Sequence, residues 1–118
     1  MQISADYLKE FIFEKGYLHD CEISEFSLSG EFLEVSILNL NENFNGLPEC
    51  SGSQSGRIIF NGVKLVRVDV SGIDGGLRIY EALFSIEDEM KIMEFLLSPA
   101  GRITVHSLDI CLKLINAV

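Results

Sequence analysis

Apolar and polar residues alternate one by one through long parts of this chain, and that two-residue period limits the fold more than any other feature. It runs through residues 32–38, through residues 64–70 and through the last apolar run, residues 102–115. Successive side chains of a β-strand point to opposite faces, so each run predicts a strand with one buried face. The last run is apolar enough to predict a central strand rather than an exposed edge.

Short turn signals between these runs favour hairpins, and hairpins favour an antiparallel sheet. The Ser-Gly-Glu sequence at 29–31 predicts a tight turn between two strands. Ile23 has the wrong parity for Phe26, which predicts a bulge near Ser24. The Asn-Gly pair at 61–62 predicts another hairpin, with one long strand kinked at that glycine as the alternative.

Two segments have a helical period instead. Residues 4–16 begin with a serine that can cap a helix, carry apolar residues at Leu8, Phe11 and Ile12, and end at a glycine. Residues 86–97 contain acids near their start and apolar residues at one-face helical spacing. We therefore expect an α+β fold, with an antiparallel β-sheet or β-sandwich, an N-terminal helix and a second helix near 86–97.

The length of the chain predicts one domain that spans all of residues 1–118. No apolar run is long enough to cross a bilayer, and the first residues lack the features of a signal peptide. The three cysteines, Cys21, Cys50 and Cys111, are odd in number and widely spaced, which is typical of reduced thiols. We expect a cytoplasmic protein with no membrane association.

The net charge of −9 is concentrated in the first half of the chain. Residues 1–50 hold ten acids against Lys9 and Lys15, a balance of −8, which leaves −1 for residues 51–118. Such a field repels phosphate backbones, so we expect no nucleic-acid binding. The same field would attract a basic protein partner, although an ordinary acidic surface explains it equally well.

Motifs of common enzyme and cofactor sites are absent from the sequence. There is no phosphate-binding P-loop, no dinucleotide fingerprint, no H-E-x-x-H, no C-x-x-C and no G-x-S-x-G elbow. We expect no cofactor and no catalytic residues.

The stretch His19-Asp20-Cys21 is the strongest candidate for a chemical site, because a metal or nucleophilic site needs such residue types together. A metal set of His19, Cys21 and His106 is conceivable, but it needs strands that bring distant residues together. The simpler interpretation assigns His19 and Asp20 to a structural junction between helix and sheet, where Asp20 accepts backbone N–H groups. We expect no metal site.

Candidate contact residues lie in two neighbouring segments. Glu22, Glu25 and Glu34 give the predicted hairpin an acidic polar face. Residues 39–56 form a long connection of turn-forming residues, in which Phe44 and Leu47 either pin the connection to the core or contact a partner.

The Leu18-His19-Asp20 junction and the segment Ile58-Ile59-Phe60-Asn61-Gly62-Val63 resemble features of small β-rich bacterial families. Many of these families have no known function, and some are grouped with the immunity proteins of polymorphic toxin systems. The resemblance covers roughly residues 17–70. It implies no catalytic residues, and it implies a binding module that neutralises a toxin by covering its active surface.

The expected function is therefore that of a non-enzymatic, immunity-like protein-binding module. The alternative is a small-molecule-binding or enzymatic domain with a pocket between sheet and helix near His19 and His106. A homo-oligomer whose sheet edge pairs with itself is a third possibility.

Overall fold

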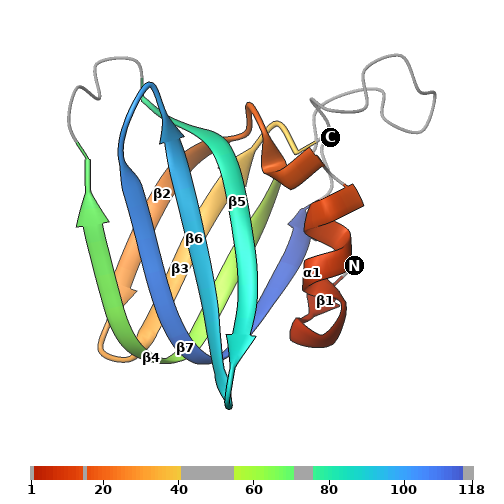
Figure 1. Ribbon diagram of the computed structural model, residues 1–118, viewed down its shortest axis with the longest axis vertical. Coiled ribbons are helices and arrows are strands. Elements are labelled where there is room, and N and C mark those ends of the chain that lie inside the picture. Colours follow the sequence, from red (N-terminus) through yellow and green to blue (C-terminus); the bar gives the residue numbers. More distant parts are fainter. Residues whose placement is uncertain (1, 15, 41–54, 71–75, 116–118) are drawn as a thin grey trace.

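The computed structural model describes residues 2–14, 16–40, 55–70 and 76–115, and its helices and strands are shown in Figure 1. The chain begins with a short strand β1 (Gln2–Ser4), helix α1 (Ala5–Glu14) and a 3-10 turn η1 (Gly16–Leu18). Six longer strands follow in the described residues: β2 (Glu22–Ser29), β3 (Phe32–Leu38), β4 (Ser55–Asp69), β5 (Leu77–Glu87), β6 (Met90–Ser98) and β7 (Arg102–Ile115).

The strands form one antiparallel sheet that closes on itself. Their order is β1-β7-β4-β3-β2-β5-β6, and β6 also pairs with β7. Six strands thus make a ring of pairings, which the short β2–β5 contact, Glu22 with Arg78 and Ile23 with Leu77, completes. The strands of this ring lie in two layers, one in front of the other in Figure 1, so the ring is a flattened barrel rather than a round one.

The flattened barrel has two layers, which we name by their hairpins. The β5–β6 layer lies in front in Figure 1 and also holds the later part of β4 and the first part of β7. The β2–β3 layer lies behind it and holds the first part of β4 and the last part of β7. The two long strands β4 and β7 therefore belong to both layers and join them at one corner.

Gly62 marks this corner on β4. It has a positive φ of 66°, and a Cβ atom there would lie 3.0 Å from the Leu108 side chain of β7. The Asn61-Gly62 hairpin prediction is wrong, and the alternative of one long strand, kinked or bulged near Gly62, is confirmed by a single β4 whose register shifts between Val63 and Leu65. An Asn-Gly pair makes a hairpin when its flanks pair with each other, but here both flanks pair with β7.

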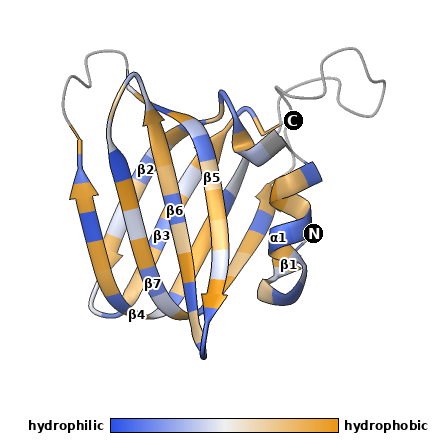
Figure 2. Ribbon diagram, viewed as in Figure 1, coloured by the Kyte–Doolittle hydropathy of each residue, from blue (hydrophilic) through white to orange (hydrophobic). Residues whose placement is uncertain are grey.

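The inward faces of both layers form one core. Figure 2 shows hydrophobic and hydrophilic residues alternating along the strands, as the two-residue period predicts. The fully buried side chains of the strands include Leu33, Val35, Ile37, Ile58, Phe60, Ile79, Ala82, Met93, Phe95, Val105 and Leu112.

Helix α1 covers the side of the barrel beside β5 and the end of β7. Its Leu8 and Ile12 are buried in the same core as the strands. Each such side chain contributes about 1.5–3 kcal/mol when it leaves water, which explains why a ten-residue helix stays in place. Other parts of the prediction are also confirmed: the β2–β3 hairpin, its register shift between Ile23 and Glu25, and the central position of β7.

The predicted helix at 86–97 is wrong. These residues form the end of β5, a turn at Asp88 and Glu89, and strand β6. Asp88 adopts a positive φ of 55°, which aspartate tolerates better than most residues. The apolar spacing fits a helix, but Met93, Phe95 and Leu97 alternate as a strand and are buried beside β7. In the described residues the fold is mainly antiparallel β with one N-terminal α-helix, not α+β with two.

Within the described ranges, no helix has both the length and the apolar character needed to cross a membrane.

Candidate functional site

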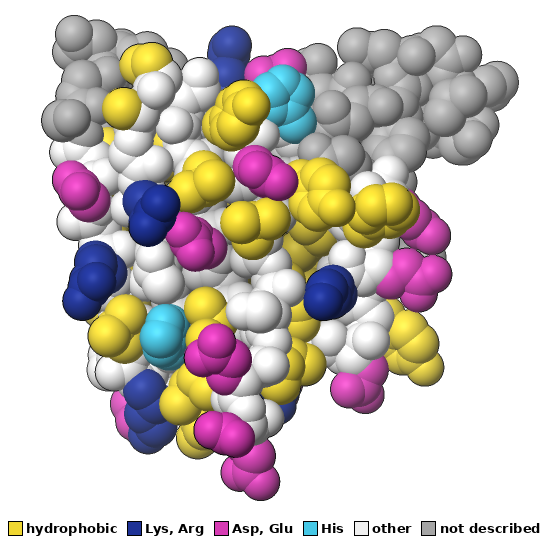
Figure 3. All heavy atoms as spheres, viewed as in Figure 1, with side chains coloured by type: hydrophobic (Ala, Val, Ile, Leu, Met, Phe, Trp, Pro, Cys, Tyr) yellow, Lys and Arg dark blue, Asp and Glu magenta, His cyan; other side chains and the backbone are white. Residues whose placement is uncertain are grey.

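Exposed aromatic side chains gather where α1, η1 and β5 meet. Phe13 is 64% exposed and Tyr80 is 55% exposed, and Tyr17 and the neighbouring Leu83 are exposed as well. Figure 3 shows hydrophobic side chains gathered over β5 and α1 on this face. A cluster of this kind is unusual on the surface of a small protein, because exposed rings do not gain the free energy of burial in the core.

A groove of about 580 Å³ runs between α1 and β5, and we call it the helix groove. Its floor consists of the buried residues Ile12, Ala82 and Phe84, and Phe13, Tyr17 and Leu83 also line it. Charged residues of α1 complete the lining: Asp6, Lys9 and Glu10.

A smaller pocket of about 240 Å³ adjoins this groove, and we call it the junction pocket. It is lined by Tyr17, His19, Tyr80 and Glu81. Tyr17 lines both cavities, so the helix groove and the junction pocket form one continuous surface.

A strained turn positions Tyr17. Tyr17, Leu18 and Asp20 have positive φ values of 56°, 58° and 68°, a conformation that costs non-glycine residues on the order of 1–3 kcal/mol each. Leu18 is fully buried, and the Asp20 N–H donates to the Ile79 carbonyl at 2.9 Å. Burial and hydrogen bonding thus hold the turn against β5, and the Tyr17 ring packs edge-on with Phe13 at 5.7 Å between centroids.

A β-bulge positions Tyr80 and Glu81. The register between β5 and β6 shifts between Ile79 and Glu81. Ile79 and Ala82 are both buried, so the two residues between them are left outside the core together. A bulge re-aims side chains in this way, and this one directs a phenol and a carboxylate toward η1.

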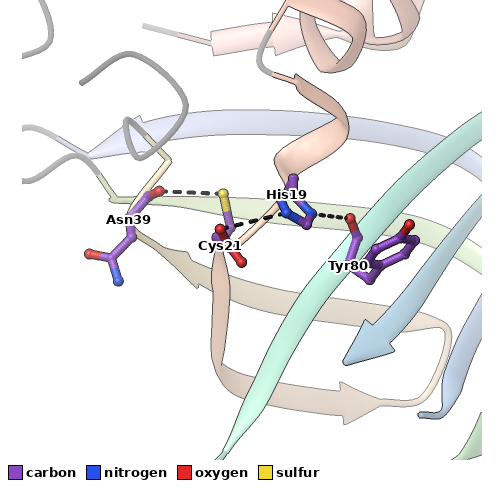
Figure 4. Close-up of polar contacts among 5 residues, drawn as sticks. His19, Cys21, Asn39 and Tyr80 are labelled. Atoms are coloured by element: carbon purple, nitrogen blue, oxygen red, sulfur yellow. Dashed lines mark hydrogen bonds and ion pairs between the residues drawn. The ribbon is translucent and has the colours of Figure 1, made fainter. Parts of the chain in front are cut away.

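His19 connects the turn to the bulge, as Figure 4 shows. Its Nδ1 lies 2.7 Å from the Tyr80 carbonyl oxygen. A carbonyl only accepts hydrogen bonds, so Nδ1 carries the proton. The two rings meet edge to face at 5.4 Å, and Nε2 lies 3.6 Å from Asp20 Oδ2.

The residues of the His19-Asp20-Cys21 stretch point in different directions. Cys21 is buried, and its thiol donates to the Asn39 carbonyl at 3.4 Å, whereas His19 faces Tyr80 (Figure 4). His106 lies on β7, paired with Leu65, and the two histidines are well separated in Figure 3. Among the residues described, no three His, Cys, Asp or Glu side chains form a group suited to a metal ion, so the hypothetical His19, Cys21 and His106 set is not brought together.

Glu22, Glu25 and Glu34 lie on the outer side of the β2–β3 layer, which we call the acidic face. Glu34 bonds to Arg57 of β4, with 3.2 Å between Oε1 and Nε. Glu25 is opposite Ser36, and both side chains point away from the core. The other two candidate contact residues, Phe44 and Leu47, lie outside the described residues.

Two titratable groups elsewhere have shifted pKa values. The Lys64 ammonium, which donates to Glu31 at 2.8 Å, holds the pKa of that carboxyl below its ordinary 4.5. Partial burial, and then the nearby Asp109 carboxylate, raise the pKa of the Cys111 thiol. Neither group lines the helix groove or the junction pocket.

The aromatic residues of this surface do not appear among the sequence-based candidates. Phe13 lies beside the apolar stripe of its helix, and Tyr80 next to Glu81 breaks the alternation of β5. Those two irregularities are the signals that could have indicated an unusual surface. The approach of Tyr17 to Tyr80 depends on the fold, because the two residues are far apart in the chain.

Comparisons of the chain with protein-family models, with curated proteins and with solved structures each gave no match.

Proposed function

We propose that this protein is a non-enzymatic, cytoplasmic binding module that recognises a basic protein through the helix groove and the junction pocket. The observation that carries the proposal is the exposure of Phe13, Tyr17 and Tyr80 beside a preformed apolar floor. Aromatic residues are enriched in protein interfaces and often provide most of the binding energy. A rigid site also loses little conformational entropy on binding.

The charges around the groove favour a basic partner. Two acids, Asp6 and Glu10, and one base, Lys9, are the charged residues that line the groove among those described, and Glu81 lines the adjoining pocket. The whole chain carries a net charge of −9. Complementary charge mainly accelerates association and rejects acidic competitors, while the aromatic residues provide affinity. Immunity-like neutralisation of a toxin, by covering its active surface, is the specific form of this function that the sequence resemblance implies.

The acidic face is a second candidate surface for the same function. Glu22 and Glu25 are not paired with a base in the ion pairs of the described residues, whereas Glu34 is held by Arg57. Flexible exposed carboxylates contribute little binding energy individually. We therefore rank this face below the continuous surface of the helix groove and the junction pocket, which we call the aromatic surface.

Binding of a small molecule is the alternative function, and the size of the helix groove favours it. A volume of about 580 Å³ falls within the range of about 300–1,000 Å³ that is typical of ligand pockets. A ligand library screened by thermal shift against wild type and Leu83→Ser tests this alternative.

The main test is a comparative capture experiment in extract of the organism of origin. The bait proteins are wild type, Phe13→Ser in the groove, and Phe32→Ser as a matched control, since Phe32 is an exposed phenylalanine of β3. We expect wild type and the control to retain the same basic protein at low salt and Phe13→Ser to lose it. Glu25→Lys, on the acidic face, serves as a fourth bait. If Phe13→Ser retains the basic protein as well as wild type does and Glu25→Lys loses it, the binding site lies on the acidic face. Recovery of only the bait, or of a self-assembled form of it, would overturn the proposal.

A further inference from the structure

The junction pocket differs from the helix groove in both size and chemistry. Its volume of about 240 Å³ is below the range of drug-sized ligand pockets and suits the end of one side chain. It is lined by two phenol rings, an imidazole and a carboxylate. Among the described residues, no lysine or arginine lines it.

This combination of groups favours a cation. The faces of tyrosine rings attract cations, and the Glu81 carboxylate adds a charge of the right sign. The Asp20 carboxylate lies 3.6 Å from Nε2 of the same His19 ring whose Nδ1 bonds to the Tyr80 carbonyl. In the part of the chain that the structure describes, an anion would find no lysine or arginine lining the pocket, and a metal ion would lack a group of three ligands.

Ring contacts and hydrogen bonds connect the walls of the pocket to one another. Phe13 packs edge-on with Tyr17, at an interplanar angle of 88°. His19 packs edge-on with Tyr80, at 81°, and donates a hydrogen bond to the Tyr80 carbonyl. Main-chain bonds from Asp20 to Ile79 and from Ile79 to Cys21 tie the two sides together. A strained turn and a bulge thus converge on one small site, as is common where backbone irregularity has a function.

We propose that the junction pocket binds the guanidinium group of an arginine side chain presented by the partner protein. A planar guanidinium stacks on an aromatic ring and bonds to a carboxylate at the same time, which an ammonium group does less well. The source of the arginine rests on the proposed function, whereas the affinity of the pocket for a guanidinium does not.

The test uses the full chain and a small probe instead of the partner. N-acetyl-arginine methylamide is titrated while the ring signals of Tyr17 and Tyr80 are followed by NMR, and the citrulline analogue serves as its neutral counterpart. We expect saturable shifts of both rings with the arginine probe and none with citrulline. Shifts that are equal for the two probes, or no saturable shift with arginine, overturn the proposal.

Variants show whether the pocket itself binds the probe. Glu81→Gln and Tyr80→Leu should each weaken the arginine probe about threefold to tenfold, because each removes one attraction for the cation. Glu87→Gln, at the far end of β5, is the matched control and should bind like wild type. A Glu81→Gln protein that keeps wild-type affinity contradicts the proposed role of its carboxylate.

The outcomes separate this inference from the proposed function. If the arginine probe binds but no partner is captured through the groove, the pocket proposal stands and the partner proposal fails. If a partner is captured through Phe13 but Glu81→Gln binds both partner and probe normally, the partner proposal stands and the pocket proposal fails.

Discussion

The acidic face and the aromatic surface belong to the same barrel but are built in opposite ways. On the acidic face one register shift, between Ile23 and Glu25, interrupts otherwise regular pairing, and Glu34 is bonded to Arg57. At the aromatic surface the chain is irregular, with three left-handed residues near η1 and a bulge in β5. Apart from that one bulge, the acidic face follows from the alternation of the sequence, whereas the aromatic surface combines several departures from it.

The difference shows which kind of surface is more informative about function. A regular hairpin with a polar outer face needs no further explanation than solubility. Strained residues in a turn and a bulge that exposes a tyrosine both lower the stability of the fold. Such features are typical of positions where the local structure serves a function. Substitutions in the two regions test this contrast.

The largest effect is expected at the floor of the helix groove. Ile12→Ala should lower the free energy of unfolding by about 2–5 kcal/mol, since it leaves a cavity between helix and sheet. Phe13→Ala, one residue away but exposed, should lower it by less than about 1 kcal/mol. Urea denaturation measures both. Similar losses for the two variants would mean that Phe13 belongs to the core and is not a contact residue.

The next effect concerns binding of the captured partner. Phe13→Ser should weaken it by about thirtyfold or more, as expected for an aromatic hot spot of about 2 kcal/mol. Glu25→Gln on the acidic face should weaken it by less than about fivefold, as for an exposed charge. Isothermal titration with the purified partner measures both affinities, and the reverse order would make the acidic face the main contact.

Substitutions at residues with a positive φ compare the backbone strain of the two regions. Gly30, in the turn of the acidic hairpin, has a φ of 59° and nothing within 4 Å of an added Cβ. Gly30→Ala should therefore cost about 1 kcal/mol through backbone strain alone. Asp20→Asn, at φ 68°, should change stability by less than about 0.5 kcal/mol, because asparagine tolerates this conformation. A neutral Gly30→Ala, measured by urea denaturation, would show that these turns are not strained.

A smaller effect is expected for the ion pair on the acidic face. Arg57 and Glu34 are both partly exposed, so Arg57→Gln should lower the free energy of unfolding by at most about 0.5–1 kcal/mol. The difference from wild type should shrink at high salt, which screens such pairs. A loss that persists in high salt would point to packing of the arginine stem instead of charge.

The smallest effect is a pKa change at Glu31, also on the β2–β3 hairpin. Lys64 lowers the pKa of Glu31 in the folded state, so the stabilisation is present above the ordinary pKa of 4.5. It is lost as the pH falls through the lowered folded value. Lys64→Gln should return the pKa toward 4.5 in an NMR titration of the Glu31 carboxyl, and Lys91→Gln should leave it unchanged. A Glu31 pKa that stays low in Lys64→Gln would require another cation nearby.

Prediction from the sequence succeeded where structure depends on neighbouring residues. The α1 helix, the β2–β3 hairpin and the bulge at Ser24 follow from local period and parity, and all are present. Residues 86–97 were assigned wrongly, because apolar spacing fits both a helix and a strand. Pairing of Met93 with Val105 of β7 decides between them, and that contact is remote in sequence.

The candidate site was less accessible to prediction than the fold. The sequence indicated His19 as a special position and assigned it to the junction between helix and sheet, where it lies. Tyr80, its ring partner, is 61 residues away along the chain, and no local pattern connects the two. The acidic residues were easy to find because charge is visible in composition.

The amino-acid sequence indicated which residues face the core in α1 and in strands such as β3, because strand and helix periods are properties of a few consecutive residues. It also determined the acidic character of the first hairpin. Only the tertiary structure decided that the strands close into a flattened barrel, that Gly62 bends a strand instead of ending it, and that Tyr17 and Tyr80 line one pocket. Those features arise from contacts between distant segments, whose partners are selected by the packing of the whole core.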